Sequence, residues 1–163
     1  MSPRYDRIAM TLHWVIAALV LIQFATGWSW GMFERGSDGR FYLFRTHLVS
    51  GWAILVLAIA RLAYRLSVPQ PPLPDDMSRL QRIAANISHG LLYLAILVQP
   101  LLGIVTVSAF GKRLGGWPGA IHVALAWAIA PLVLVHVLAA FWHQFGRRDR
   151  LLERMLPVRL PSS

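Results

Sequence analysis

The sequence predicts an all-α integral membrane protein in which four transmembrane helices form a single bundle. Of the 163 residues, 56% are hydrophobic and only 14% are charged, and the apolar residues gather in long blocks. A helix needs about 20 mostly apolar residues to cross the hydrocarbon core of a bilayer, and four segments approach or exceed that length. We therefore expect the whole chain, residues 1–163, to form one membrane domain.

The first predicted helix covers residues 8–30, which is too long for a cleavable signal peptide. The second predicted helix covers about residues 44–64 and has the weakest signal of the four. Its charge-free part runs only over 46–60. The span is complete only if the side chains of Arg61 and Arg65 reach back to the membrane interface, as long basic side chains do.

A stiff loop is predicted to follow the second helix, because the stretch SVPQPPLPDD, residues 67–76, is rich in proline, which cannot continue a helix. The third predicted helix covers 83–110 and the fourth covers 120–145. A basic tail, 147–163, is expected to lie on the inner membrane surface. The connections are too short to hold a soluble catalytic module, so any chemistry must take place inside the four-helix bundle.

The distribution of arginine and lysine predicts that both termini lie in the cytoplasm. With the N-terminus inside, eleven basic residues fall on the cytoplasmic side and five fall outside. This topology, together with attraction to anionic lipid, explains the formal net charge of +9 better than nucleic-acid binding does. The inner set is Arg4, Arg7, Arg61, Arg65, Arg79, Arg82, Arg147, Arg148, Arg150, Arg154 and Arg159, and the outer set is Arg35, Arg40, Arg45, Lys112 and Arg113.

Histidine is the one side chain in this sequence that is suited to holding a metal. The chain has no cysteine, which excludes disulfides, thiolate metal sites and covalent haem attachment through C-x-x-C-H. Because the helices alternate in direction and rise about 1.5 Å per residue, we expect His47 and His122 to lie together at the outer side. His13, His89 and His136 compete for an inner site.

The fourth predicted helix carries two histidines on one face at different depths. His122 and His136 are separated by about 21 Å along the helix axis and by about 40° in rotation. A histidine from another helix at each level would complete a bis-histidine pair around a haem iron, which leaves no open coordination position and suits electron transfer. Hydrogen bonding between helices is the alternative role for these histidines, and their pairing at two depths favours haem.

Four of the histidines are followed one helical turn later by a small residue, which would leave room for a flat macrocycle. His89 is followed instead by Tyr93, so this pattern selects His13 as the partner of His136. The four combinations are His13 with Ala17, His47 with Gly51, His122 with Ala126 and His136 with Ala140.

Several stretches carry a resemblance to a known family. They are HW at His13 and Trp14, the run THLVSGWAILVLAIARLAYRL leading into a P-x-P-P loop, the run SHGLLYLAILVQPLLG, and the spacing of His122, His136 and His143. Together they resemble the bacterial cytochrome b-561 family over nearly the whole chain. The resemblance implies a bacterial inner-membrane protein with two b haems, one bound by His13 and His136 and the other by His47 and His122. It also implies a link to the ubiquinone pool and, in some members, oxidation of superoxide at the outer face.

Other polar residues have expected roles around such cofactors. Arginine binds carboxylates with two parallel hydrogen bonds, so the haem propionates have natural partners in Arg45 on the outer side and in Arg61 or Arg65 on the inner side. Anchoring at the interface is the alternative role for these arginines. His143, half-exposed at the inner interface, is a candidate donor of a proton or hydrogen bond to a quinone. The alternative is an ordinary interfacial histidine at a helix end. His89 is expected to hydrogen-bond near the inner site.

Three functions compete at this point. The first is a superoxide:quinone oxidoreductase, which moves electrons from superoxide or another one-electron donor outside to membrane ubiquinone. The second is a haem-bearing membrane anchor for a separate dehydrogenase or hydrogenase. The third, a metal-ion transporter, fails because no Asp or Glu lies inside any predicted helix. An anionic donor is favoured because the outer segments carry their five basic residues against only Glu34 and Asp38.

Overall fold

The computed structural model describes residues 4–74 and 76–158, and this part of the chain is helical without strands. Arg159 of the inner basic set and the last residues of the predicted tail lie outside the described residues. Within them, four helical segments are long and apolar enough to cross a membrane: Arg7–Met32, Asp38–Ser67, Arg79–Val107 and Trp117–Gly146. The predicted all-α membrane fold with four spans is confirmed.

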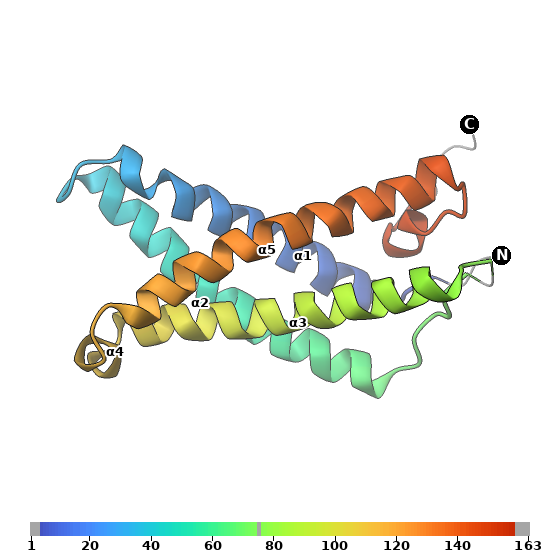
Figure 1. The fold of residues 1–163 in the computed structure, drawn as a ribbon, viewed down its shortest axis with the longest axis horizontal. Coiled ribbons are helices and arrows are strands. Elements are labelled where there is room, and N and C mark those ends of the chain that lie inside the picture. Colours follow the sequence, from blue (N-terminus) through green and yellow to red (C-terminus); the bar gives the residue numbers. More distant parts are fainter. Residues whose placement is uncertain (1–3, 75, 159–163) are drawn as a thin grey trace.

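The helices are arranged as two antiparallel pairs that cross one another (Figure 1). Helix α1 (Arg7–Trp28) packs on α2 (Asp38–Ser67), α3 (Arg79–Val107) packs on α5 (Trp117–Phe141), and α2 also contacts α3. The α1–α2 connection and the short helix α4 (Ala109–Arg113) lie at one end of the bundle, which we call the outer end. The first and last parts of the described chain lie at the other end, which we call the inner end.

Two of the spans begin earlier than their apolar blocks. Helix α2 starts at Asp38 rather than near Phe44, because the Ser37 side chain accepts a hydrogen bond from the backbone of the first turn. Helix α3 starts behind a capping box, in which Ser78 and Gln81 satisfy each other's backbone N–H groups. Capping residues in the polar interface therefore set these helix starts, whereas hydropathy indicates only the region that crosses the apolar core.

The helix ends also differ from the predicted ones. Helix α3 stops at Val107 rather than Phe110, because Ser108 adopts an extended conformation and its side chain caps α4. After α5, the chain continues as a π-helix over Trp142–Gly146, and α1 continues as a 3₁₀-helix over Ser29–Met32. The first span thus ends in a tighter 3₁₀ turn, and the fourth span ends in a wider π-helical turn.

Large apolar side chains cover the outside of the bundle. Leu21, Val56, Leu94 and Leu134, one from each span, are all more than half exposed in the isolated chain. In a bilayer such side chains contact lipid, which is as apolar as a protein interior. The contact between the helices is made by fewer residues, among them Ile16 and Ala58.

Residues 147–158 of the tail fold back onto the inner end of the bundle, and the prediction that the tail lies on the inner membrane surface stays a prediction. Arg154 is buried, and its guanidinium donates to the carbonyl oxygen of Pro72 at 2.6 Å. The indole of Trp14 donates to the carbonyl oxygen of Met155 at 2.6 Å. These contacts with α1 and with the α2–α3 loop hold residues 147–158 as a cap over the inner end.

Candidate functional site

Two histidines face each other near the outer end of the bundle. His47 lies on α2 and His122 lies on α5, with ring centroids 6.1 Å apart and ring planes at 79°. An iron atom about 2.0 Å from one nitrogen of each ring would separate two in-line ring centroids by about 6 Å. The pair therefore has the spacing of two axial ligands of one metal.

Hydrogen bonds determine which ring nitrogen of each outer histidine keeps a lone pair with which to bind a metal. Nδ1 of His122 lies 3.1 Å from the carbonyl oxygen of Gln99, so Nδ1 must donate. Nδ1 of His47 lies 3.0 Å from the Thr26 hydroxyl, whose own hydrogen goes to the carbonyl oxygen of Ile22 at 2.7 Å, so this Nδ1 also donates. Both rings are left with a lone pair on Nε2, the arrangement found in metal-binding histidines whose other nitrogen is held by an acceptor.

Two glutamines hold the backbone of these histidines in the same way. The Gln23 side chain on α1 donates to the carbonyl oxygen of His47 at 2.6 Å. The Gln99 side chain on α3 donates to the carbonyl oxygen of His122 at 2.7 Å. Each antiparallel helix pair thus supplies one histidine and one glutamine to the outer site.

A glycine follows each glutamine by one turn and faces the histidine ring. A Cβ atom added to Gly27 would lie 3.5 Å from Cε1 of His47, and one added to Gly103 would lie 3.1 Å from Cε1 of His122. Sequence reasoning missed this repeated Gln-x-x-x-Gly unit. A comparison of the first and third spans at helical spacing would have found it as QFATG and QPLLG.

The inner site brings three histidines together. The ring centroids of His13 on α1 and His136 on α5 are 6.3 Å apart, with ring planes at 68°. His89 on α3 lies closer to His136, at 5.4 Å and 76°. A separation of 5.4 Å is shorter than two in-line axial imidazoles need around an iron, so the geometry favours His13 and His136 as the ligand pair.

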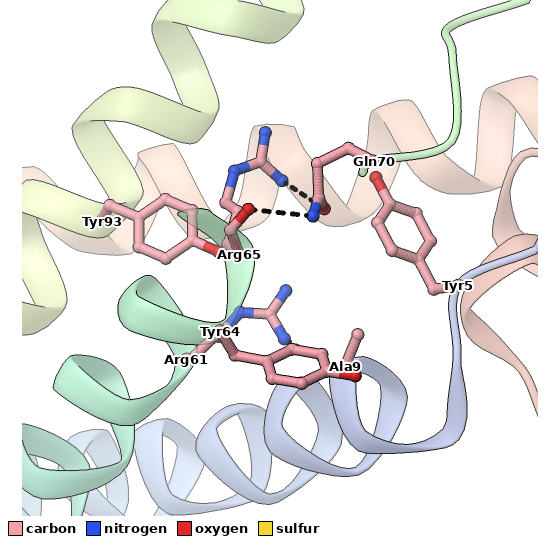
Figure 2. A pocket seen from close by; sticks show the side chains of 7 residues that line it. All are labelled: Tyr5, Ala9, Arg61, Tyr64, Arg65, Gln70 and Tyr93. Atoms are coloured by element: carbon pink, nitrogen blue, oxygen red, sulfur yellow. Dashed lines mark hydrogen bonds between the residues drawn. The ribbon is translucent and has the colours of Figure 1, made fainter. Parts of the chain in front are cut away.

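The inner arginines line a small hollow between α1, α2 and α3 (Figure 2). The Arg61 guanidinium donates to the carbonyl oxygen of Ala9 at 2.8 Å, and Arg65 donates to the Gln70 side chain at 3.3 Å. Both guanidiniums lie within 6 Å of the Tyr93 ring centroid. Since a guanidinium has five N–H donors, each arginine keeps donors with which to bind a carboxylate.

The remaining residues predicted around the cofactors lie on the same helices as the histidines. Arg45 is exposed at the outer end of α2. Gly51 is close to α1, where an added Cβ atom would lie 3.3 Å from the Gln23 side-chain nitrogen. Three further small residues are half-buried: Ala17, Ala126 and Ala140.

His143 is buried, with 6% of its surface exposed, and is not half-exposed as predicted. It lies in the π-helix, and its Nδ1 atom is 2.5 Å from a carboxylate oxygen of Asp149. The folded tail covers the ring, which explains why a reading of the α5 helix alone placed it at the surface.

The chain is similar to known proteins over nearly its full length. The model of the prokaryotic cytochrome b561 family matches residues 4–158. Cytochrome b562 of Cereibacter sphaeroides is 39% identical, over 97% of this chain and 98% of that protein. Cytochrome b561 homolog 2 of Escherichia coli (strain K12) is 30% identical, over 94% and 91% of the two chains. A probable superoxide oxidase, CybB, of Yersinia pestis is 28% identical, over 96% and 98%.

Proposed function

Because the chain belongs to the prokaryotic cytochrome b561 family, we propose that it moves electrons through two b haems, from superoxide at the outer face to ubiquinone in the membrane. The family carries out electron transfer in bacterial membranes, and haem b is the cofactor that it implies. The pairing of histidines at two levels of the bundle is the observation that carries the two-haem proposal.

In this proposal, His47 and His122 bind the outer haem, and His13 and His136 bind the inner haem. Both pairs have ring centroids just over 6 Å apart, and their α5 members are about 21 Å apart along the helix axis. A haem iron with two histidine ligands gains and loses single electrons and has no coordination position left for another ligand. The outer histidines are oriented for ligation by their Nδ1 hydrogen bonds.

Arginine and the small residues complete both haem sites in this proposal. Arg45 binds a propionate of the outer haem, and Arg61 or Arg65 binds a propionate of the inner haem. The rings occupy the space beside the small residues one turn from each ligand: Ala17, Gly51, Ala126 and Ala140.

We place the inner end of the bundle in the cytoplasm. The larger set of basic residues belongs to this end, as the positive-inside rule requires. The whole chain then forms one multi-pass domain of the bacterial inner membrane, with both termini inside. Ubiquinone would be reduced near the inner haem, where His143 is the candidate proton donor.

Superoxide is the donor that fits the outer end. The relative named as a probable superoxide oxidase is similar over nearly the full length of both chains. The outer connections of this chain carry the exposed cations Lys112 and Arg113, which attract an anion electrostatically. Two superoxide ions would each lose one electron to become dioxygen, and one quinone would take up both electrons and two protons to become quinol.

Reduction of the haems by superoxide should become slower as salt is added. The attraction between superoxide and the outer cations is screened over about 10 Å at 0.1 M salt, whereas a neutral donor has no such dependence. Lys112→Glu should also slow the reduction. Arg79→Glu is the matched control, because it reverses an exposed charge at the inner end and should leave the rate unchanged. Stopped-flow absorbance of the isolated protein with a superoxide source measures these rates.

A rate no faster than the reaction without protein would contradict superoxide as the donor. The same holds for a rate that is insensitive to both ionic strength and charge reversal at Lys112. Either result would favour the second candidate function, a haem-bearing membrane anchor for a dehydrogenase or hydrogenase.

A further inference from the structure

A buried pair of ionisable side chains lies at the inner end, outside both histidine pairs. Nδ1 of His143 and Oδ2 of Asp149 are 2.5 Å apart, and the two side chains are only 7% and 8% exposed. Removing such groups from water is costly unless they are paired and hydrogen-bonded. The proposed electron path gives Asp149 no role.

The backbone adopts unusual conformations on both sides of this contact. His143 lies in the π-helix Trp142–Gly146, a form that is rare and frequent at functional sites. Asp149 stands between Arg148 and Arg150, whose φ angles of 59° and 57° fall in the left-handed region that residues other than glycine seldom adopt. Strained backbone of this kind clusters at functional sites, and here it places one carboxylate against one imidazole.

Backbone hydrogen bonds keep the carboxylate in place. The Asp149 backbone N–H donates to the carbonyl oxygen of His143 at 3.1 Å. The other carboxylate oxygen of Asp149 accepts from the backbone N–H of Leu151 at 3.2 Å. Residues 143–149 therefore form a turn that is closed by the hydrogen bonds between Asp149 and His143.

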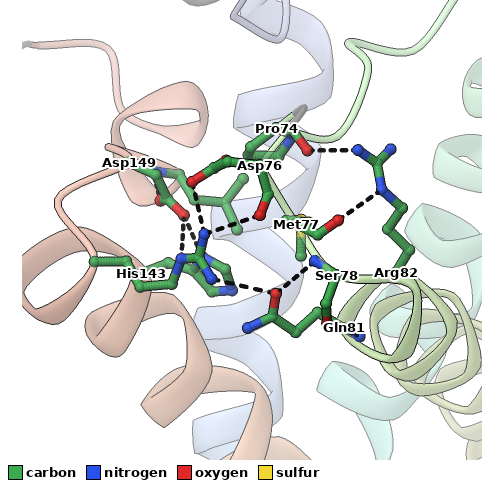
Figure 3. A network of polar contacts seen from close by, with 10 residues as sticks. Pro74, Asp76, Met77, Ser78, Gln81, Arg82, His143 and Asp149 are labelled. Carbon is green, nitrogen blue, oxygen red and sulfur yellow. Dashed lines mark hydrogen bonds and ion pairs between the residues drawn. The ribbon is translucent and has the colours of Figure 1, made fainter.

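The charged groups around the pair connect it to the surface (Figure 3). Arg147 lies 3.6 Å from the Asp149 carboxylate and 2.6 Å from the Asp76 carboxylate on the α2–α3 loop. Asp76 is 64% exposed, and the guanidinium of Arg147 holds the pKa of this carboxyl below its usual range. Two further charged residues, Glu153 and Arg150, lie 3.8 Å apart within the tail.

The second nitrogen of the His143 ring takes no part in these contacts. Among the residues that the structure describes, Nε2 of His143 has no hydrogen-bond partner, while Nδ1 is held by Asp149. His143 follows His136 by about 10 Å along the helix axis. The imidazole is thus near the level at which an acceptor would receive electrons from the inner haem.

We propose that Asp149 is a positioning residue that holds His143 by Nδ1, so that the imidazolium donates protons from Nε2 to the quinone reduced at the inner end. This inference rests on the proposed function. The quinone gains two electrons from the haems and two protons, one at a time, from His143, and becomes quinol. Each proton that leaves Nε2 of His143 is replaced from the inner aqueous phase.

The test measures how fast quinone oxidises the haems, without using superoxide. The haems of the complete protein are reduced with a limiting amount of dithionite, a short-chain ubiquinone is added at several concentrations, and haem absorbance is followed in H₂O and in D₂O. The variants are Asp149→Asn and His143→Ala. Glu153→Gln is the matched control, because Glu153 is also buried in the tail but hydrogen-bonds to Gln144 rather than to a histidine.

Asp149→Asn should lower the maximal rate at least about tenfold, since general acid catalysis contributes about 10²- to 10⁴-fold. The quinone concentration that gives half-maximal rate should not change, and the slowing in D₂O should increase because proton donation limits the rate. His143→Ala should be slowed in the same way and partly restored by added imidazole. Glu153→Gln should stay within about twofold of the unchanged protein, as expected for a residue without a role in proton donation.

Equal rates in Asp149→Asn, His143→Ala and the unchanged protein would overturn the inference and leave the proposed function standing. Equal slowing in Glu153→Gln, or an unchanged D₂O effect in a slowed Asp149→Asn, would also overturn it, because Asp149 would then only stabilise the tail. If quinone does not oxidise the haems of the unchanged protein, both the inference and the quinone part of the proposed function fail. If only reduction by superoxide fails, the donor assignment alone is wrong.

Discussion

His122→Ala is expected to remove the outer haem and retain the inner one, and His136→Ala is expected to do the reverse. Each substitution would delete one of the two proposed axial ligands of a haem, and α5 carries no other histidine at the same depth to replace it. Pyridine-haemochrome spectra, normalised to protein, should therefore fall from two haems per chain to one in either variant. A redox titration of the remaining haem would show that the two variants keep different haems.

His89→Ala is the control for this prediction, because the His89 and His136 ring centroids are 5.4 Å apart, which is less than the separation expected for two in-line axial ligands. This variant should keep both haems, whereas His13→Ala should lose the inner one. Loss of a haem in His89→Ala together with two haems in His13→Ala would overturn the inner pairing.

Gly103→Leu is expected to abolish or strongly reduce binding of the outer haem. An added Cβ atom already lies 3.1 Å from Cε1 of the His122 ring, and the rest of a leucine side chain would push this ring out of position. Overpacking of this kind typically costs about 1–3 kcal/mol. Haem content and the spectrum of the remaining haem should show loss of the outer haem only.

Gly90→Leu is the matched control on the same helix, because an added Cβ atom there meets nothing within 4 Å. Leucine suits a membrane helix, so neither variant should misfold for lack of hydrophobicity. Full haem content in Gly103→Leu would show that the glycine is not part of a haem site. Equal loss of haem in both variants would indicate a general effect on α3.

Local properties of the chain were enough to predict the spans. Hydropathy located all four membrane helices, and the resemblance to the cytochrome b-561 family is confirmed by the family match over residues 4–158. Helix ends were less predictable, because a hydrogen bond from Ser37 or Ser78 sets the start of a helix outside the apolar block. The break at Ser108 likewise depends on a cap within the connection.

The depth of each histidine followed from the sequence, because depth depends only on the position along a helix of known rise. That calculation placed His47 level with His122, and the structure brings the two rings to 6.1 Å. It left His13 and His89 as competitors at the inner level, since both have suitable depths. The small residue one turn after His13 favoured His13, and the tertiary structure adds the two ring separations, 6.3 Å for His13 and 5.4 Å for His89.

The sequence by itself determined the membrane fold, the number of spans and the two histidine levels, because these depend on local composition and on regular helix geometry. The tertiary structure decided which side chains surround those histidines and whether a polar residue is buried. His143 became buried because the tail folds back and places Asp149 against it. Gln99 and Gly103 lie beside His122 because the face of α3 that carries them packs against α5. Such contacts join residues that are distant in sequence, and they depend on the rotation of each helix about its axis, which no local pattern specifies.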